Sequence, residues 1–205
     1  IVRLCQNNFL RLFRIFIQLF ADFEVIDEEN CAGLSGPHIF VSNHKNYLDP
    51  FIVGASVIRK SKLAPIRVMT ADEYLKIPIL NLFLLSQGCF PTYYGKGIEF
   101  SLKWPHEVLL RGRCIGIFPE GQMVRGNGFG IPSKGAAILA LQSRKPILPF
   151  AIKGSDHLTL RNIGRHRPKV SVRIGMPILL HEQTSDPNHG TDVIMREIVK
   201  LYESI

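Results

Sequence analysis

Apolar residues in this chain gather in short runs and in longer periodic segments, with polar stretches between them. Short apolar runs bounded by turn residues are typical of buried strands, and longer periodic segments are typical of helices. The predicted strands cover residues 39–41, 64–70, 89–94, 114–118, 146–152 and 170–174. The predicted helices cover residues 1–21, 50–60, 96–111, 134–144 (with Ser133 as N-cap) and 192–203. Their alternation predicts an α/β fold with a central mixed, largely parallel sheet flanked by helices.

The N-terminal pattern predicts an amphipathic helix over residues 1–21. Leucine, isoleucine and phenylalanine cover most of its surface, and Arg3, Arg11 and Arg14 lie on the remainder. The longest uncharged run after Arg14 is seven residues, well short of the roughly 20 that a spanning helix needs. The helix suits either the bilayer interface, where arginine meets phosphate, or a half-buried position against the domain.

Two further segments bear on the organisation of the chain. Residues 22–37 are polar, with an acidic cluster at 27–29, and we expect them to form a connection. The chain length fits one domain, so we divide it into an interface helix with its connection, residues 1–30, and a globular domain, residues 31–205. Residues 77–86 are apolar on nearly all sides, which predicts either burial in protein or contact with lipid.

The charge balance restricts the partners. Lysine and arginine number 25 against 17 aspartate and glutamate, a net charge of +8. Such a surface attracts phospholipid, nucleic acid or a phosphorylated ligand, although a merely solvated basic surface explains the charge equally well. A nucleic-acid reader interleaves aromatic and basic residues, and the basic run at 161–169 contains no aromatic residue. We therefore expect a membrane surface and no nucleic acid.

The cysteines and the start of the chain give weaker information. The four cysteines lie far apart and show no C-x-x-C spacing, so we expect no metal site and a reducing compartment. The chain starts at Ile1 rather than methionine. A signal or transmembrane segment ahead of it stays open.

The segment from Ile39 to Pro50 carries the first candidate chemistry. A short predicted strand ends at Ser42-Asn43-His44, and Asp49 follows five residues after the histidine. An aspartate that accepts one ring N–H of a histidine leaves the other ring nitrogen free to take a proton. Asp49 is equally suited to cap a helix that starts at Pro50, and the two roles are compatible.

A second polar segment follows the clearest predicted strand, 114–118. Pro119-Glu120-Gly121 comes directly after it, and a glycine-rich stretch at 126–130 comes next. Parallel strands end at one edge of a sheet, and ligand sites form there. We therefore expect His44, Asp49 and Glu120 to converge.

Several motifs together resemble those of the glycerolipid acyltransferases, the family that includes 1-acylglycerol-3-phosphate acyltransferase. Asn43-His44 with Asp49-Pro50 resembles the family's His-x4-Asp motif, and Phe118-Pro119-Glu120-Gly121 resembles the start of its Glu-Gly motif. Residues 134–137 and 146–149 look like a later helix and a proline-bearing strand of the family. The resemblance covers residues 39–154.

The resemblance implies transfer of a fatty acyl group from a thioester, on coenzyme A or acyl carrier protein, to a hydroxyl of a lysolipid. It implies that His44 is the general base, that Asp49 orients it, and that Glu120 and Gly121 seat the acceptor. The thioester is a co-substrate, and no cofactor or metal is implied. Residues 31–205 would form the catalytic domain, associated with the cytoplasmic face of a membrane.

Two departures from the family pattern leave the acceptor open. Gln122-Met123-Val124 stands where the family continues with Thr-Arg-Ser or similar, and Tyr94 stands where an arginine is expected to hold the acceptor phosphate. Lys96, Arg125 or Lys134 would then supply the charge. Lysophosphatidic acid is the default acceptor, with an ornithine lipid or a glycolipid as alternatives. A catalytically silent lipid-binding protein is the competing interpretation.

Overall fold

A computed structural model describes residues 2–63, 65–92, 97–159, 162 and 167–205, and within them seven strands form one sheet. The strands are β1 (Asp22–Ile26), β2 (Ile39–Ser42), β3 (Ile66–Ala71), β4 (Phe90–Thr92), β5 (Cys114–Ile117), β6 (Ile147–Lys153) and β7 (Lys169–Ile174). The α-helices are α1 (Val2–Phe20), α2 (Asp49–Val57), α3 (Pro78–Ser86), α4 (Ile98–Leu110), α5 (Gly135–Ser143) and α6 (Pro187–Glu203). Short 3-10 turns are η1 (Glu28–Cys31), η2 (Tyr74–Lys76), η3 (Ser155–His157) and η4 (Leu180–Glu182).

The strand order is β1-β7-β6-β2-β5-β3-β4. The strands from β6 to β4 run parallel, β7 is antiparallel to β6, and β1 is parallel to β7. The prediction of an α/β fold around a mixed, largely parallel sheet is confirmed.

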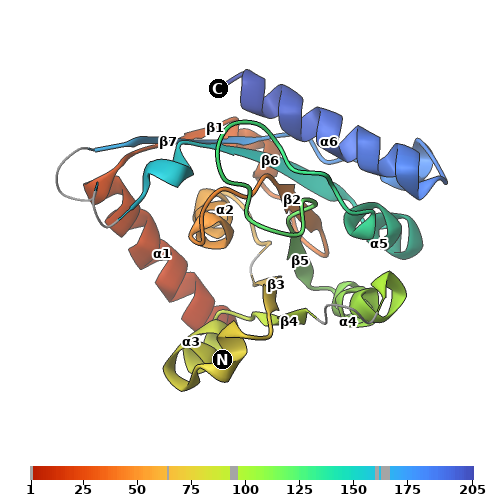
Figure 1. Cartoon of the computed structure of the whole chain (residues 1–205), viewed down its shortest axis with the longest axis horizontal. Coiled ribbons are helices and arrows are strands. Elements are labelled where there is room, and N and C mark those ends of the chain that lie inside the picture. The colour runs from red at the N-terminus through yellow and green to blue at the C-terminus, as the bar shows by residue number, and fades with distance from the viewer. Residues whose placement is uncertain (1, 64, 93–96, 160–161, 163–166) are drawn as a thin grey trace.

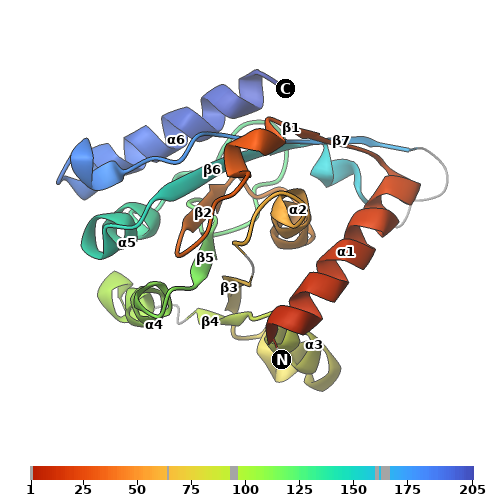
Figure 2. The same cartoon turned by 180° about the vertical axis from the view of Figure 1, so that it is seen from behind.

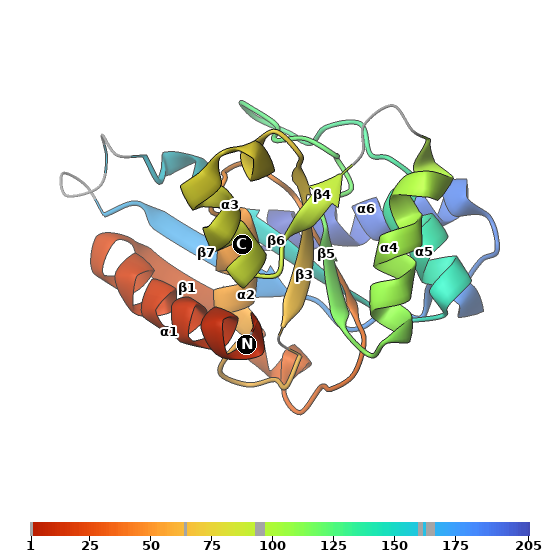
Figure 3. The same ribbon diagram turned by 90° about the horizontal axis from the view of Figure 1, so that it is seen from below.

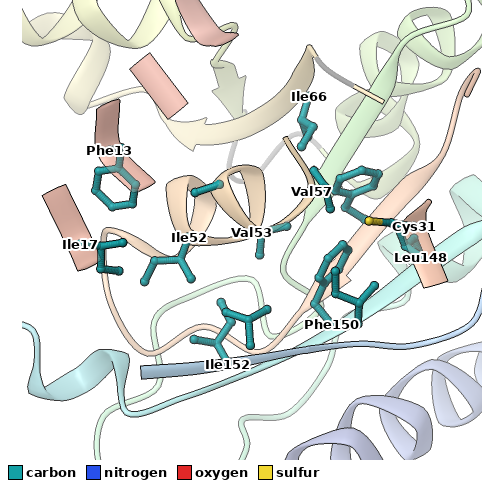
Figure 4. Packing of buried hydrophobic residues seen from close by; sticks show 14 of the residues in the cluster. Phe13, Ile17, Cys31, Ile52, Val53, Val57, Ile66, Leu148, Phe150 and Ile152 are labelled. Atoms are coloured by element: carbon teal, nitrogen blue, oxygen red, sulfur yellow. The ribbon is translucent and has the colours of Figure 1, made fainter. Parts of the chain in front are cut away.

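Two helical layers cover the sheet, because side chains along each strand alternate between its faces. From β2, Phe40 enters the hydrophobic cluster on the side of α1 and α2, whereas Ile39 and Val41 enter the cluster shared with α4, α5 and α6. Figures 1 and 2 show α1, α2 and α3 on one side of the sheet and α4, α5 and α6 on the other. In Figure 4, Ile52 and Val53 of α2 lie between Phe13 of α1 and Phe150 of β6.

The structure corrects the expectation for residues 22–37. This segment contains an edge strand, β1, which pairs with β7 from Asp22 to Ile26. Phe23 and Val25 are half-buried against the core, whereas Asp22 and Glu24 are exposed. An edge strand alternates polar and apolar residues, so a segment rich in acidic residues resembles a connection in sequence. The division at residue 30 stays a prediction, and α1 and β1 share a core with the rest of the chain.

Two helix starts also differ from expectation. The N-cap of α5 is Lys134 rather than Ser133, and the Ser133 amide donates to the carbonyl of Pro119 instead. Helix α6 starts earlier than expected, at Pro187, since the side chain of Asp186 accepts hydrogen bonds from the next backbone amides. An aspartate N-cap followed by proline is a favoured helix start.

Helix α1 is half-buried. Its inner face carries Gln6, Leu10, Phe13 and Ile17. The amide of Gln6 donates to the carbonyls of Ile66 (2.9 Å) and Gln87 (2.6 Å) and accepts from the Ile66 N–H (2.8 Å). This buried side chain therefore joins α1 to β3 and to the end of α3.

The outer surfaces of α1 and α3 are apolar. Leu4, Leu12, Ile15, Phe16 and Leu19 of α1 are exposed. None of the side chains of α3 is buried, and Ile79 and Leu82 are 86% and 74% exposed. Among the described residues, α3 is thus half-buried: Phe83 packs against Phe9 and Phe51, and the outer side of the helix is exposed. No helix in the described part of the chain combines the length and the apolar character that crossing a bilayer requires.

Candidate active site

The candidate site lies at the carboxyl ends of β2 and β5, two paired parallel strands in the middle of the sheet. Figure 3 shows that the segments following β3 and β5 leave at the same end of the sheet. Asn43, directly after β2, continues the pairing with β6 through its side chain. Its amide donates to the carbonyl of Ile152 and accepts from the Ile152 N–H, both at 2.8 Å. This buried pair fixes the position from which His44 leaves the sheet.

His44 and Asp49 are in contact. The Nδ1 atom of His44 lies 3.0 Å from Oδ2 of Asp49. The Asp49 side chain is fully buried, whereas the His44 side chain is 18% exposed. If Nδ1 carries the proton toward the carboxylate, Nε2 has a free lone pair.

The sequence allowed Asp49 to be the N-cap of the helix that follows, but it does not cap α2. The N-cap residue is Leu48, and Asp49 lies in the first turn. Its Oδ2 also accepts the backbone N–H groups of Lys45 (2.6 Å) and Asn46 (2.7 Å). The carboxylate therefore folds the loop between β2 and α2, residues 43–48, around itself. Asn46 holds the far side of that loop by donating to the carbonyl of Ser155 at 2.7 Å.

Glu120 joins the segment after β5 to His44. Its side chain is 6% exposed. Oε2 accepts the backbone N–H of His44, and Oε1 accepts the N–H of Gly130, both at 2.9 Å. Charge-assisted bonds of this kind are stronger than neutral ones. Glu120 thus holds the backbone of His44, and the predicted acceptor contact of this residue stays a prediction.

Residues 121–132, called the glycine loop from here on, form one wall of the site. Gly121 has a φ of +68°, and its N–H donates to the carbonyl of Phe118 at 2.9 Å. A side chain at this left-handed turn would be strained. The N–H of Val124 donates to the carbonyl of His44 at 2.8 Å. Both backbone groups of His44 are therefore bonded to the segment that follows β5.

An apolar pocket lies behind the histidine. The ring of Phe118 stacks on the imidazole of His44, with centroids 4.2 Å apart. Phe118 also lines a narrow apolar pocket. The other lining residues are Phe40, Ser42, Pro50, Val53, Ile66, Val68, Gly116 and Ile117. A second narrow pocket shares Pro50, Ile66 and Val68 with it.

Comparison with known proteins identifies the family. The Acyltransferase family model matches residues 22–153, more than half of the chain. The chain belongs to this acyltransferase family. It is 30% identical over 177 residues to the 1-acyl-sn-glycerol-3-phosphate acyltransferase of Saccharomyces cerevisiae, covering 83% of this chain and 56% of the relative. It is 27% identical over 173 residues to that of Borreliella burgdorferi, covering 82% and 66%.

The fold of this acyltransferase family member is also found in a solved structure. The crystal structure of a 1-acyl-sn-glycerophosphate acyltransferase from Thermotoga maritima matches with a TM-score of 0.68 and 22% identity. The match covers 94% of this chain and 79% of that chain. The chain spans between about half and two thirds of the length of the two curated relatives.

The predicted site residues have different outcomes. The structure brings His44, Asp49, Glu120 and Gly121 together, and Arg125 is an exposed residue of the glycine loop. The calls on Tyr94 and Lys96 fall outside the described residues. Sequence reasoning assigned no role to Asn43, Lys45, Asn46 or Phe118. Their only signal was proximity to the two motifs, because their partners are mainly backbone groups distant in sequence.

The buried cysteines of the acyltransferase are poor nucleophiles. Burial raises the pKa of Cys31, Cys89 and Cys114 to about 11. These thiols are protonated near pH 7, whereas the thiolate is the reactive form. Among the described residues, no group of three or more histidine, cysteine, aspartate or glutamate side chains is placed to hold a metal ion.

Proposed function

We propose that this protein is an O-acyltransferase that moves a fatty acyl group from an acyl thioester to a hydroxyl of a lysolipid in phospholipid synthesis. The observation that carries the proposal is the contact between His44 and the buried Asp49 at the carboxyl edge of the sheet. It is the arrangement of a general base and its orienting carboxylate. Membership of the acyltransferase family supports the reaction class.

In this mechanism Nε2 of His44 takes the proton of the acceptor hydroxyl as its oxygen attacks the thioester carbonyl. Asp49 holds the ring by Nδ1 and stabilises the imidazolium that forms. The tetrahedral intermediate expels the thiolate, which takes the proton from His44 and leaves as the free thiol. The acyl group passes directly to the acceptor, so the protein needs no nucleophile of its own.

We place the acyl chain of the thioester at the narrow apolar pocket behind Phe118, at the mouth of which the chain would enter. That pocket is lined mainly by apolar side chains and by Gly116, and it lies against the residue that stacks on His44. Apolar burial there would orient the reactive carbonyl toward the histidine. The donor is acyl-coenzyme A or acyl carrier protein, and the protein binds it as a co-substrate without a resident cofactor.

The default acceptor is 1-acylglycerol-3-phosphate, which the names of the relatives support. An ornithine lipid or a glycolipid is the alternative, because Tyr94 replaces the expected phosphate-binding arginine. Arg125, Lys96 and Lys134 are the candidate cations for an anionic headgroup.

The exposed apolar faces of α1 and α3 support association with a membrane surface, which we place at the cytoplasmic face. Both helices lie on the same side of the sheet and contact each other. Apolar side chains that sink below the headgroups would bring the site to a substrate that resides in the bilayer.

The test is release of free thiol from palmitoyl-coenzyme A, with acyl carrier protein as second donor, by the protein on liposomes with a panel of lysolipids. We expect acceptor-dependent thiol release that falls about 10²–10⁴-fold in His44→Ala. The matched control is His189→Ala, since His189 is exposed on α6. Residual activity above about a tenth in His44→Ala would refute the role of His44. Liposome binding without transfer from either donor would favour a silent lipid-binding protein.

A further inference from the structure

Lys45, between the catalytic histidine and Asn46, has a role that the proposed chemistry does not use. Its ammonium group donates to the carbonyl oxygens of Gly126 (2.9 Å) and Gly128 in the glycine loop. No carboxylate lies within ion-pair distance of Lys45 in the part of the chain that the structure describes. The cation is therefore fixed by two peptide carbonyls more than 80 residues away in sequence.

The glycine loop is suited to this contact. Gly126 and Gly128 have φ values of +79° and +89°, a left-handed backbone that glycine adopts without strain. A Cβ atom at either position would meet nothing within 4 Å. These glycines therefore fit the backbone path of the loop rather than tight packing. That path brings both carbonyls to the same ammonium group.

Lys45 completes a closed set of contacts around His44. The glycine loop already reaches His44 through Val124, which bonds its carbonyl, and through Gly130, which bonds Glu120. Glu120 in turn bonds the N–H of His44. The ammonium group of Lys45 fastens residues 125–128, which are exposed, whereas the next residue, Phe129, packs against Tyr202 of α6.

We propose that Lys45 is a positioning residue, whose ammonium group holds the glycine loop against the catalytic segment and thereby keeps His44 in its reactive geometry. This inference rests on the proposed acyltransferase function for its kinetic consequence. Its structural consequence, an anchored loop, is independent of that function. The two are measured separately.

The loop itself contains the reporter. Arg125 is exposed and precedes Gly126, so trypsin cleaves between them when the loop leaves its anchor. In Lys45→Met, which keeps the length of the side chain but removes the donors, we expect cleavage after Arg125 to accelerate about tenfold. This is the order expected when a charged hydrogen bond is lost. Mass spectrometry follows the cleaved bond.

The kinetic arm uses the same variants. We expect kcat of Lys45→Met to fall about tenfold, because His44 is displaced from its reactive position. KM for the thioester should stay within twofold of wild type, because the binding of the donor is unchanged. Lys45→Arg retains donors for both carbonyls and is expected to restore both measurements to within threefold. Lys62→Met, at an exposed lysine ahead of β3, is the matched control. Circular dichroism and the thermal midpoint check that each variant is folded.

The outcomes are distinct. Faster cleavage together with a lower kcat supports the proposal. Faster cleavage in a protein without detectable transferase activity leaves the anchor standing and refutes the proposed function. Unchanged cleavage refutes the anchor, whatever happens to kcat, and a lower kcat would then show direct contact with a ligand. Faster cleavage with unchanged kcat refutes the positioning role.

Discussion

At the scale of single residues, two buried carboxylates organise the site by accepting backbone N–H groups. Asp49 accepts two amides besides the histidine ring, and Glu120 accepts one amide from each of the segments that it joins. Hydrogen bonds offset the cost of burying a charge, and at Asp49 they all go to Oδ2, whereas Oδ1 has no partner among the described residues. The same carboxylates therefore hold the loops and set the position of His44.

The first prediction concerns Glu120→Gln. A glutamine has one acceptor oxygen in place of two, so its NH₂ group would face a backbone N–H of His44 or Gly130. Leaving that donor unpaired costs about 1–3 kcal/mol, which lowers the thermal midpoint by roughly 2–12 °C. Calorimetry measures the thermal midpoint. In the thiol assay, we expect kcat to decrease by a larger factor than KM for the acceptor increases.

The control for this prediction is Glu107→Gln. Glu107 is an exposed residue of α4, paired with Arg111 at 3.7 Å. We expect that variant to retain the midpoint and the kinetics of the wild type. A variant at Glu120 with an unchanged midpoint and kcat but a much higher acceptor KM would show that Glu120 contacts the acceptor.

At the scale of elements, α3 is the least buried helix of the described chain, since none of its side chains is buried. It follows η2, whose Tyr74 ring lies 6.2 Å from the ring of Tyr47 in the loop between His44 and Asp49. The apolar surface of α3 is thus connected to the loop between His44 and Asp49 by two aromatic side chains. Contact of α3 with lipid would place that loop near the bilayer.

The second prediction concerns this surface. Replacing Ile79 and Leu82 with aspartate removes two exposed apolar side chains and adds two charges that lipid disfavours. We expect vesicle binding in a flotation assay to weaken at least ~tenfold, since burying one such side chain contributes about 1.5–3 kcal/mol. Met176→Asp, at an exposed methionine that follows β7, is the matched control. Equal binding of all three proteins would exclude α3 from the contact.

At the scale of the whole molecule, the net charge of +8 accompanies the apolar faces. Anionic headgroups attract each basic residue near a membrane by about 1 kcal/mol, and this attraction falls off within one Debye length of the surface. Raising NaCl from about 0.1 M to about 1 M shortens the Debye length from about 10 Å to about 3 Å. At the higher salt concentration, the electrostatic contribution to membrane binding should nearly vanish, whereas the contribution of the apolar side chains should remain.

The third prediction follows from this separation. We expect binding to vesicles rich in phosphatidylglycerol to weaken at least ~tenfold between about 0.1 M and about 1 M NaCl, by cosedimentation. Binding to neutral phosphatidylcholine vesicles is the control and should change little. Equal salt dependence for both lipids would mean that the positive charge has another partner.

Some features of the fold and of the candidate site were predictable from the sequence, and others were decided only by the tertiary structure. The buried strands β2, β5 and β6 were predictable, because continuous apolar runs can be satisfied only inside a sheet covered on both faces. The contact between His44 and Asp49 was predictable too, since five residues of local chain bring them together. The alternatives for Asp49 and α3 were decided only by structure: Asp49 binds upstream amides, and α3 lies on the surface.

The sequence by itself determined the fold class, the central strands and the residues at their ends, because local apolar patterns and short loops specify them. Only the tertiary structure decided that residues 22–26 form an edge strand, that Glu120 bonds the amides of His44 and Gly130, and that Lys45 reaches the glycine loop. The reason is physical. These contacts join a side chain or a strand edge to backbone groups of distant segments, and every residue except proline offers the same N–H and carbonyl.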